Sequence, residues 1–400
     1  HIRERIMSLV KYAGVSLIAM SASMGHAGGI EDTALSAGFM FEDGSYGSVS
    51  VKSQSPSVQG TVKYIGPGTL STGKAVGDPA TKGSLIGSVT STNLKAKMDV
   101  LDNMSVGITY YRQAGIKLDY QSNWDTPTSA AVLPKVDLDV TALAALVKYD
   151  FNDNISALVG IKNGTASDAT VSILAKAVSA QATGKSALSY IIGGAYEIPE
   201  IALRAELIYE TSAAFSLPTK FAALASPPFP VAFPGDDTGL IDASTPDYIN
   251  IYVQSGIAED TLAYVSARQA NWKTNQVSIT HDFTQGNDDA QPLGTAKDLS
   301  SFSDTTSYEV GLGRKFGTTW SSSIAYNWEG GSGPSSSSFF TLTDGRQGLS
   351  IGAKYSWNEN TDISFGGNYT QFGDTTHDAA TGGTAFTGNT ATTLGLNISH

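Results

Sequence analysis

The stretch IALRAELIYE, residues 201–210, alternates between apolar and charged side chains. Successive side chains of a strand point to opposite faces, so an extended chain here would have one apolar face and one charged face. The apolar face would consist of Leu203, Ala205, Leu207 and Tyr209, and the other face of Arg204, Glu206, Ile208 and Glu210. Such a strand covers a protein core or meets lipid, and the rest of the chain decides between the two.

The same alternation recurs along most of the chain. It is found at 94–100, 105–110, 143–151, 349–357 and 393–398. Helical periodicity is nearly absent, which predicts an all-β chain of long strands.

The lengths of the connections predict the architecture. Short connections fall at 101–103, 152–154, 197–200, 258–260, 317–319 and 358–360, and longer ones at about 55–83, 121–134, 164–185, 213–246, 271–304, 330–345 and 374–388. Seven long and six short connections in strict alternation make fourteen strands. Bacterial transmembrane barrels combine short periplasmic turns, long outer loops and an even number of strands. The sequence therefore predicts an all-β fold, a 14-stranded antiparallel transmembrane β-barrel over residues 45–400.

Aromatic residues on the apolar faces gather near the strand ends. They are Tyr149, Phe151, Tyr209, Trp320, Tyr326, Trp328, Tyr355 and Trp357. Aromatic girdles at both interfaces are typical of membrane barrels. A soluble β protein explains each aromatic residue singly but not their joint placement.

The composition of the chain excludes several classes of function. The chain is 16% charged with a formal charge of −12, and nucleic-acid binding calls for a basic surface. It has no cysteine, which excludes disulfides and thiolate sites. Residues 1–27, with 1–6 as an upstream extension before Met7, predict a secretory signal peptide, and the bacterial outer membrane is the expected location. A buried N-terminal helix is the alternative.

Catalytic spacings are missing from the sequence. Outside the signal peptide, the histidines are His281, His377 and His400, and none of them belongs to a nucleophile or metal motif. The acidic stretches 235–237 and 287–289 are typical of solvated loops, with calcium binding as the alternative. We expect no enzyme activity, no cofactor and no metal.

Two long connections are unusually apolar for surface loops. Residues 167–184 have a short amphipathic helical pattern, and residues 216–235 hold five prolines, which predicts a stiff loop with few ladder hydrogen bonds. They supply a candidate groove for hydrophobic molecules, formed by Ile173, Leu174, Val178, Phe221, Leu224, Phe229, Val231 and Phe233. A loop cap packed on the barrel rim is the alternative.

A segment before the first strand is a candidate plug. Fourteen strands enclose a lumen wider than side chains alone fill, and residues 28–44 are expected to enter it as a hatch that includes Phe39, Met40 and Phe41. A disordered periplasmic tail is the alternative.

An ordered series of segments resembles the FadL-type outer-membrane transporters of long-chain fatty acids and other hydrophobic compounds, particularly the alphaproteobacterial branch. The series comprises FEDGSYGSVSVKSQSPSVQG (41–60), LDVTALAALVKYDFNDNISALVGIK (138–162), YIIGGAYEIPEIALRAELIYET (190–211), PDYINIYVQSGIAEDTLAYVSARQANW (246–272) and SYEVGLGRKFGTTWSSSIAYNW (307–328).

The resemblance implies a 14-stranded barrel with an N-terminal hatch, capture of substrate by the third and fourth outer loops, and a lateral exit at a kink in the third strand. Gly115 stands at the kink position. Members of the family that carry fatty acids bind the carboxylate of the fatty acid with basic residues in the lumen. At the position of one such arginine this chain has Ser167. Arg112 and Lys162 are the candidate substitutes for binding a carboxylate. The chain ends in His400, where related barrels carry an aromatic residue for the insertion machinery.

The prediction is a passive outer-membrane channel for fatty acids, alkanes or aromatic compounds. Its other expected partners are outer-membrane lipids, lipopolysaccharide and the barrel-insertion machinery; nucleic acid is excluded, and the protein is expected to be a monomer. A porin-like polar channel and an outer-membrane lipid-modifying enzyme are the alternatives.

Overall fold

The structure is a computed structural model of the 400-residue chain. It describes residues 30–64, 74–125, 134–173, 178–223, 237–280, 297–331, 335–336, 338–377 and 383–400. The predicted signal peptide lies outside these ranges. In the described ranges, no helix is long and apolar enough to cross a bilayer.

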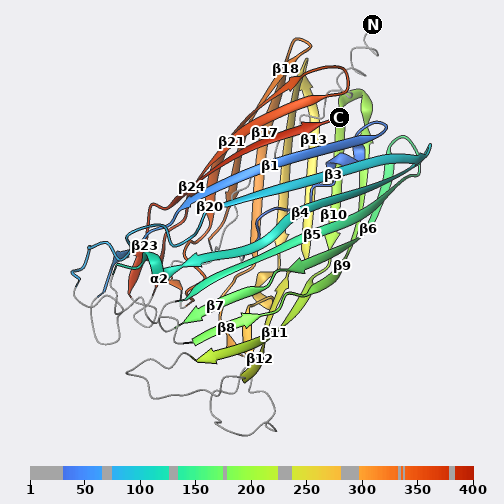
Figure 1. Ribbon diagram of the computed structural model, residues 1–400. Coiled ribbons are helices and arrows are strands. Elements are labelled where there is room, and N and C mark those ends of the chain that lie inside the picture. The colour runs from blue at the N-terminus through green and yellow to red at the C-terminus, as the bar shows by residue number, and fades with distance from the viewer. Residues whose placement is uncertain are drawn as a thin grey trace.

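Fourteen long antiparallel strands of the described chain close into a ring (Figure 1). In ring order they are β1 (Tyr46–Ser57), β3 (Val89–Leu101), β4 (Met104–Asp119), β5 (Lys135–Asp150), β6 (Ile155–Ala166), β9 (Ser186–Ile198), β10 (Leu203–Glu210), β13 (Tyr248–Ala258), β14 (Thr261–Ala270), β17 (Thr305–Phe316), β18 (Trp320–Glu329), β20 (Arg346–Ser356), β21 (Asp362–Phe372) and β24 (Thr390–Ser399). β24 pairs with β1, with Ser399 opposite Ser48, and this seam completes the barrel. The predicted strand number and architecture are confirmed.

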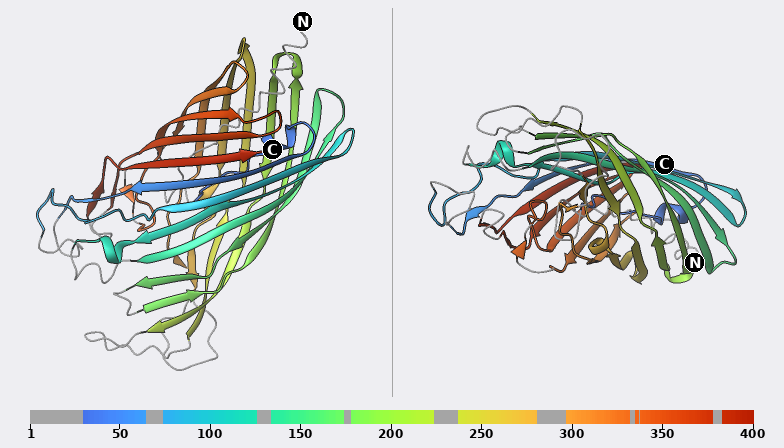
Figure 2. Two further views of the ribbon diagram at one scale, coloured as in Figure 1. Left: turned by 45° about the horizontal axis from the view of Figure 1, so that its top comes forward. Right: turned by 90° about the horizontal axis from the view of Figure 1, so that it is seen from below.

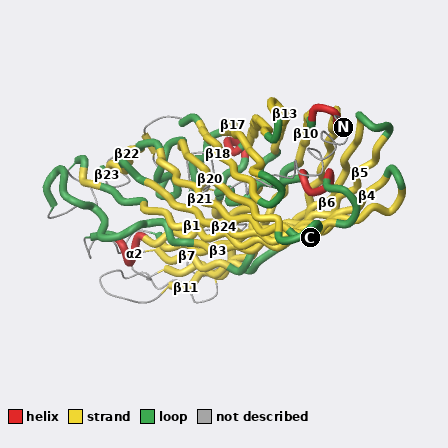
Figure 3. Tube along the Cα trace, turned by 90° about the horizontal axis from the view of Figure 1, so that it is seen from above, coloured by secondary structure: helices red, strands yellow, loops and turns green. Residues whose placement is uncertain are grey.

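The short turns lie at one end of the barrel and the long connections at the other. The turn between β9 and β10 holds the 3-10 helix η2 (Pro199–Ile201) and Ala202, which adopts the left-handed conformation with φ 50°. Helix α2 (Tyr120–Asn123) and the small sheet of β2 (Thr61–Val62), β19 (Ser335–Ser336), β22 (Thr375–His377) and β23 (Thr384–Phe386) lie at the opposite end from the C-terminus (Figure 3). In a bacterial barrel the long-loop end is the outer one.

The strand faces answer the question raised by residues 201–210. Leu207 is 55% exposed and Tyr209 38%, whereas Glu206 and Glu210 are 7% and 0% exposed. The other strands of the ring likewise expose large apolar side chains on one face and bury polar ones, such as Lys52, Lys97 and Asn368, on the other. A water-facing surface of this size and polarity would associate or aggregate, so the apolar band faces lipid and the charged face lines the lumen.

Aromatic side chains border this band at both ends, as predicted. Near the short turns, the Trp320 and Tyr355 rings lie 4.9 Å apart and those of Tyr149 and Phe151 5.2 Å apart. Near the long loops, the Tyr308 and Trp328 rings stack at 5.7 Å.

Additional strands extend the wall at the long-loop end (Figure 2). They are β7 (Ala169–Ile173), β8 (Val178–Ala182), β11 (Ala213–Ala223), β12 (Asp237–Thr245), β15 (Ser278–Thr280) and β16 (Lys297–Asp298). The helical expectation for residues 167–184 is wrong, because β7 and β8 form a hairpin whose backbone groups pair with β5 and β11. The expectation of few ladder bonds for residues 216–235 is wrong over 216–223, where even Pro218 lies in strand β11.

Candidate functional site

The N-terminal segment, residues 30–45, lies inside the barrel, where the dark-blue ribbon runs between the walls in the view from below (Figure 2, right). Its backbone bonds to β4: the amides of Asp32 and Thr33 donate to the Gln113 carbonyl at 2.8 and 3.3 Å. The Gly115 amide donates to the Ile30 carbonyl at 2.9 Å. The segment thus acts locally as a strand beside β4, and Glu31 forms an isolated bridge with Ala114.

The part of this segment nearest the short turns packs in an apolar cluster. The 3-10 helix η1 (Gly38–Phe41) buries Phe39 and Met40. We call the following residues the inner cluster: Leu35, Ala37, Phe39, Met40, Tyr111, Ala142, Ala144, Leu146, Leu158, Ile191 and Ile208. Gly107 of β4 leaves room for Met40, since a Cβ there would lie 2.8 Å from the Phe39 ring and closer still to the Met40 sulfur.

Basic side chains of the barrel wall contact the C-terminal end of this segment. The Arg204 guanidinium lies 4.6 Å from the Phe41 ring centroid. Lys97 donates to the carbonyls of Glu42 and Gly44 at 2.7 and 2.9 Å. Burial raises the pKa of the Glu42 carboxyl, while the positive charge of Arg204 opposes that rise.

A second apolar cluster fills the lumen towards the long-loop end. We call it the outer cluster; it includes Ile30, Ala114, Ile116, Leu118, Val140, Phe215, Leu217, Tyr248, Trp272 and Phe302. It joins the wall extensions to the tip of the N-terminal segment. The N-terminal segment therefore runs from the outer cluster, through Ile30, to the inner cluster at Leu35.

Between the two clusters lies a layer of ion pairs. The first group joins four strands: Lys162 of β6 and Glu210 of β10 pair at 2.7 Å with side chains each 1% exposed. Arg268 of β14 pairs with Glu210 at 3.3 Å and with Glu31 of the N-terminal segment. Its guanidinium also lies 3.8 Å from the ring centroid of Tyr248, on β13.

The second group surrounds Asp32, the next residue of the segment. Lys52 of β1 pairs with Asp32 at 2.8 Å, and Arg112 of β4 pairs with the same carboxylate at 3.0 Å. Arg112 also pairs with Asp139 of β5 at 2.5 Å. Two consecutive acidic residues, Glu31 and Asp32, thus bind different sides of the barrel.

The hydrogen-bonded pairing of β3 with β4 ends at the level of this layer, and we call the unpaired stretch beyond it the opening. β3 and β4 pair from Leu101 opposite Met104 to Leu94 opposite Tyr110, and no further pairs follow in the described residues of these strands. Beyond that point the two strands diverge (Figure 1), and β4 carries a bulge between Arg112 and Ala114. The N-terminal segment and residues 85–87 take over the free edge of β4. This explains why residues 111–116 are all buried instead of alternating.

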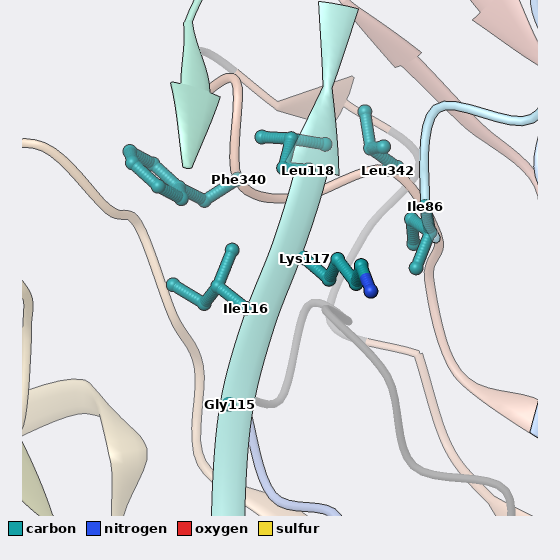
Figure 4. Close-up of a pocket in the computed structure, with 7 residues that line it drawn as sticks. All are labelled: Ile86, Gly115, Ile116, Lys117, Leu118, Phe340 and Leu342. Carbon is teal, nitrogen blue, oxygen red and sulfur yellow. The ribbon is translucent and has the colours of Figure 1, made fainter. Parts of the chain in front are cut away.

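A small apolar pocket adjoins the opening (Figure 4). Gly115, Ile116, Lys117 and Leu118 of β4 line it together with Ile86, Phe340 and Leu342. Its cavity volume is about 10 Å³, enough for about one water molecule. A larger guest therefore requires side chains to move.

The predicted site residues meet different outcomes. Phe39 and Met40 are buried in the lumen, and Phe41 is half-buried there. β4 has a bulge between Arg112 and Ala114, next to Gly115, and the role of Gly115 in a lateral exit stays a prediction. Arg112 and Lys162 both face acids of the chain itself, and their binding of a ligand carboxylate stays a prediction.

The predicted loop groove falls mostly outside the described side chains. Leu224, Phe229, Val231 and Phe233, as well as Leu174, lie outside the described residues. Ile173, Val178 and Phe221 belong to strands β7, β8 and β11 by their backbones. The groove therefore stays a prediction.

Sequence reasoning missed the partners in the ion-pair layer, above all Glu31, Asp32, Lys52 and Arg268. Lys52 alternates with the preceding Val49 and Val51, and Arg268 with the preceding Val265 and Ala267, and that signal places both cations in the lumen. Of the candidate histidines, His377 is buried with its Nε2 2.8 Å from the Thr341 carbonyl, and His281 lies outside the described residues. In the described ranges, no group of acidic residues and histidines is arranged to hold a metal ion.

Solved structures share this fold. A FadL homologue from Pseudomonas aeruginosa matches with a TM-score of 0.70 at 12% identity, over 91% of this chain and 92% of that one. The toluene transporters TodX of Pseudomonas putida and TbuX of Ralstonia pickettii match with TM-scores of 0.60 and 0.58, each at 9% identity. The TodX match covers 95% of this chain and 97% of that one, and the TbuX match 89% of both. No protein-family model and no curated protein matches the chain.

Proposed function

We propose that this barrel carries hydrophobic small molecules passively across the outer membrane. The molecule would leave water at the apolar outer loops, enter the outer cluster and leave through the opening between β3 and β4. Residues 28–44 would act as the hatch; in support of this, their described part bonds to β4 and packs in the inner cluster. The structural neighbours include a FadL homologue and toluene transporters, which agrees with this class of cargo.

The observation that carries the proposal is the change of polarity along the lumen. An apolar molecule in the outer cluster gains about 25 cal/mol for each Å² of apolar surface removed from water. Movement straight down the axis would bring it into a layer of buried charges, where it would separate buried ion pairs. The wall opens at this same level, and the large apolar side chains outside it, such as Leu94 and Tyr110, mark the edge of the lipid-facing band.

The cargo class includes fatty acids, alkanes and aromatic compounds. Pairing of Arg112, Lys162 and Arg268 with acids of the chain favours uncharged cargo. A fatty acid would have to exchange its carboxylate for one of those acids. Lipids and lipopolysaccharide would surround the apolar band, and no energy source is needed as long as the cell consumes the product.

Uptake of labelled toluene and labelled oleate by cells that carry the barrel tests the proposal. The chain has no cysteine, so a disulfide introduced by Glu31→Cys with Ala114→Cys is unambiguous. These residues form a bridge pair, and such pairs have Cα separations that a disulfide can span. We expect oxidation to stop uptake by tying the segment to β4, and reduction to restore it. Uptake no faster than in cells without the barrel would refute the function.

A polar channel is the second candidate, and one observation favours it. Several buried polar side chains of the inner wall have no hydrogen-bond partner among the described residues; they include Gln54, Ser364, Thr393 and Asn397. Such groups suit a hydrated wall. Planar-bilayer conductance separates the candidates, since a barrel filled by its N-terminal segment should conduct very little.

A further inference from the structure

Arg112 stands where β4 leaves β3. The bulge that follows it changes the register of β4 against β5, from Arg112 opposite Thr141 to Ala114 opposite Val140. The preceding pair of β3 and β4, Leu94 with Tyr110, is the last of that ladder in the described residues. The Arg112 side chain therefore begins at the edge of the opening, and it is only 7% exposed.

The two acids that bind Arg112 lie on opposite sides of the wall. Asp32 belongs to the N-terminal segment in the lumen and is 1% exposed. Asp139 is 51% exposed and alternates along β5 with Leu138 and Val140, whose side chains belong to the outer cluster inside the barrel. Asp139 thus lies on the outer face, and the guanidinium reaches from the lumen to that face.

Gly115 gives the guanidinium its path. A Cβ at Gly115 would lie 2.7 Å from the Arg112 Cζ and closer still to Nη2. It would also lie 2.7 Å from the Leu138 carbonyl oxygen of β5, which cannot move without breaking the strand. The Arg112 guanidinium therefore occupies the space that a side chain at position 115 would take.

We propose that Arg112 is the residue that closes the side opening of the barrel. Held by Asp32 on the inside and Asp139 on the outside, it occupies the space through which a hydrophobic molecule would leave. Release of cargo then requires Arg112 to give up its ion pair with Asp32 or with Asp139. This inference rests on the proposed function and adds the residue that limits exit.

Arg112→Met is a suitable test variant because it leaves no buried charge alone. Asp32 keeps its ion pair with Lys52 at 2.8 Å, and Asp139 is already half in water. Methionine retains much of the apolar volume and adapts to irregular spaces. We therefore expect the variant to fold, which heat-resistant migration on a gel without boiling would verify.

The experiment measures the initial uptake rate of labelled toluene by cells carrying equal amounts of the wild-type or variant barrel. We expect Arg112→Met to raise the rate about tenfold, which corresponds to about 1.4 kcal/mol. The matched control is Lys52→Met, which removes the other cation at Asp32 but leaves Arg112 in the opening, and its rate should stay near that of the wild type.

Each result is decisive. An unchanged or slower rate in folded Arg112→Met overturns the role of Arg112, and so does an equal acceleration in Lys52→Met, which would point to the loosened segment instead. If neither the wild type nor any variant takes up toluene or oleate, the proposed function fails. If the Glu31–Ala114 disulfide stops uptake while Arg112→Met has no effect, the route stands and only the assignment of Arg112 falls.

Discussion

Replacement of Lys162 by methionine tests the ion-pair layer most directly. Lys162 and Glu210 are almost fully buried and 2.7 Å apart. Together with Arg268 and Glu31 they form a group of two cations and two carboxylates, so its net charge is zero. Lys162→Met leaves two carboxylates to share Arg268. Removal of one partner of a buried pair costs about 3–5 kcal/mol, and we expect the free energy of unfolding to fall by that amount.

The charge balance also predicts a rescue. Glu31→Gln alone should destabilise the barrel by about 1–3 kcal/mol, because Arg268 loses a charge-assisted bond. In the Lys162→Met background the same change should stabilise, since one cation and one carboxylate then remain. Such a change of sign between residues that do not touch is a coupling through shared partners.

Urea unfolding of the protein folded in lipid vesicles, followed by fluorescence of the five tryptophans, measures all four proteins of this cycle. If Glu31→Gln weakens both backgrounds by the same amount, the four charges do not act as one group. The description of the layer as a balanced unit would then be wrong.

Three further predictions concern the outer face, the inner cluster and the end of the N-terminal segment. Ile324 is 48% exposed on the lipid side and lies midway between the aromatic girdles. The substitution Ile324→Arg should lower the free energy of unfolding by about 2–4 kcal/mol, and Ile324→Ala should lower it far less. Equal losses of stability for the two variants in vesicles would contradict a lipid-facing position. Gly107→Val should push Met40 away from the wall and raise planar-bilayer conductance, whereas a silent variant would contradict the close contact. The Glu42 carboxyl has a raised pKa because of burial, so its stabilising contribution is complete below the ordinary pKa of a glutamate and lost as the pH rises through the raised value. The N-terminal segment should therefore resist protease better at pH 5 than at pH 8, and Glu42→Gln should reduce that difference.

The barrel was predictable because its signals are local. Each strand repeats the period of two seen in residues 201–210, and each short turn interrupts it. A barrel in lipid has apolar side chains outside and polar ones inside, the reverse of a soluble protein, but the alternation has the same period of two. The alternation therefore cannot distinguish lipid from a protein core, and the alternation of long and short connections was needed to decide. Gly115 was singled out by the family resemblance. Its physical role, which is to leave room for Arg112, is visible only in the three-dimensional structure.

The wrong prediction and the missed residues have different causes. Residues 167–184 have helical spacing of apolar side chains, yet β5 and β11 offer free backbone edges that favour strands β7 and β8. The ion-pair layer could not be predicted because its partners lie far apart in the sequence. Glu31 and Arg268 are separated by most of the chain, and no local pattern says which of the lumen charges will meet.

The seam between β1 and β24 has a consequence for how the molecule is made. Gly47 and His400 exchange backbone hydrogen bonds of 2.7 and 2.8 Å, so the first and last strands of the ring meet only after the whole chain has been synthesised. Contacts between such distant residues form late in folding, because the intervening chain must first be ordered. The N-terminal segment leads directly into β1, so the strand that closes the seam also carries the segment that bonds to β4. Closure of the wall and placement of the N-terminal segment therefore depend on the position of one strand, β1.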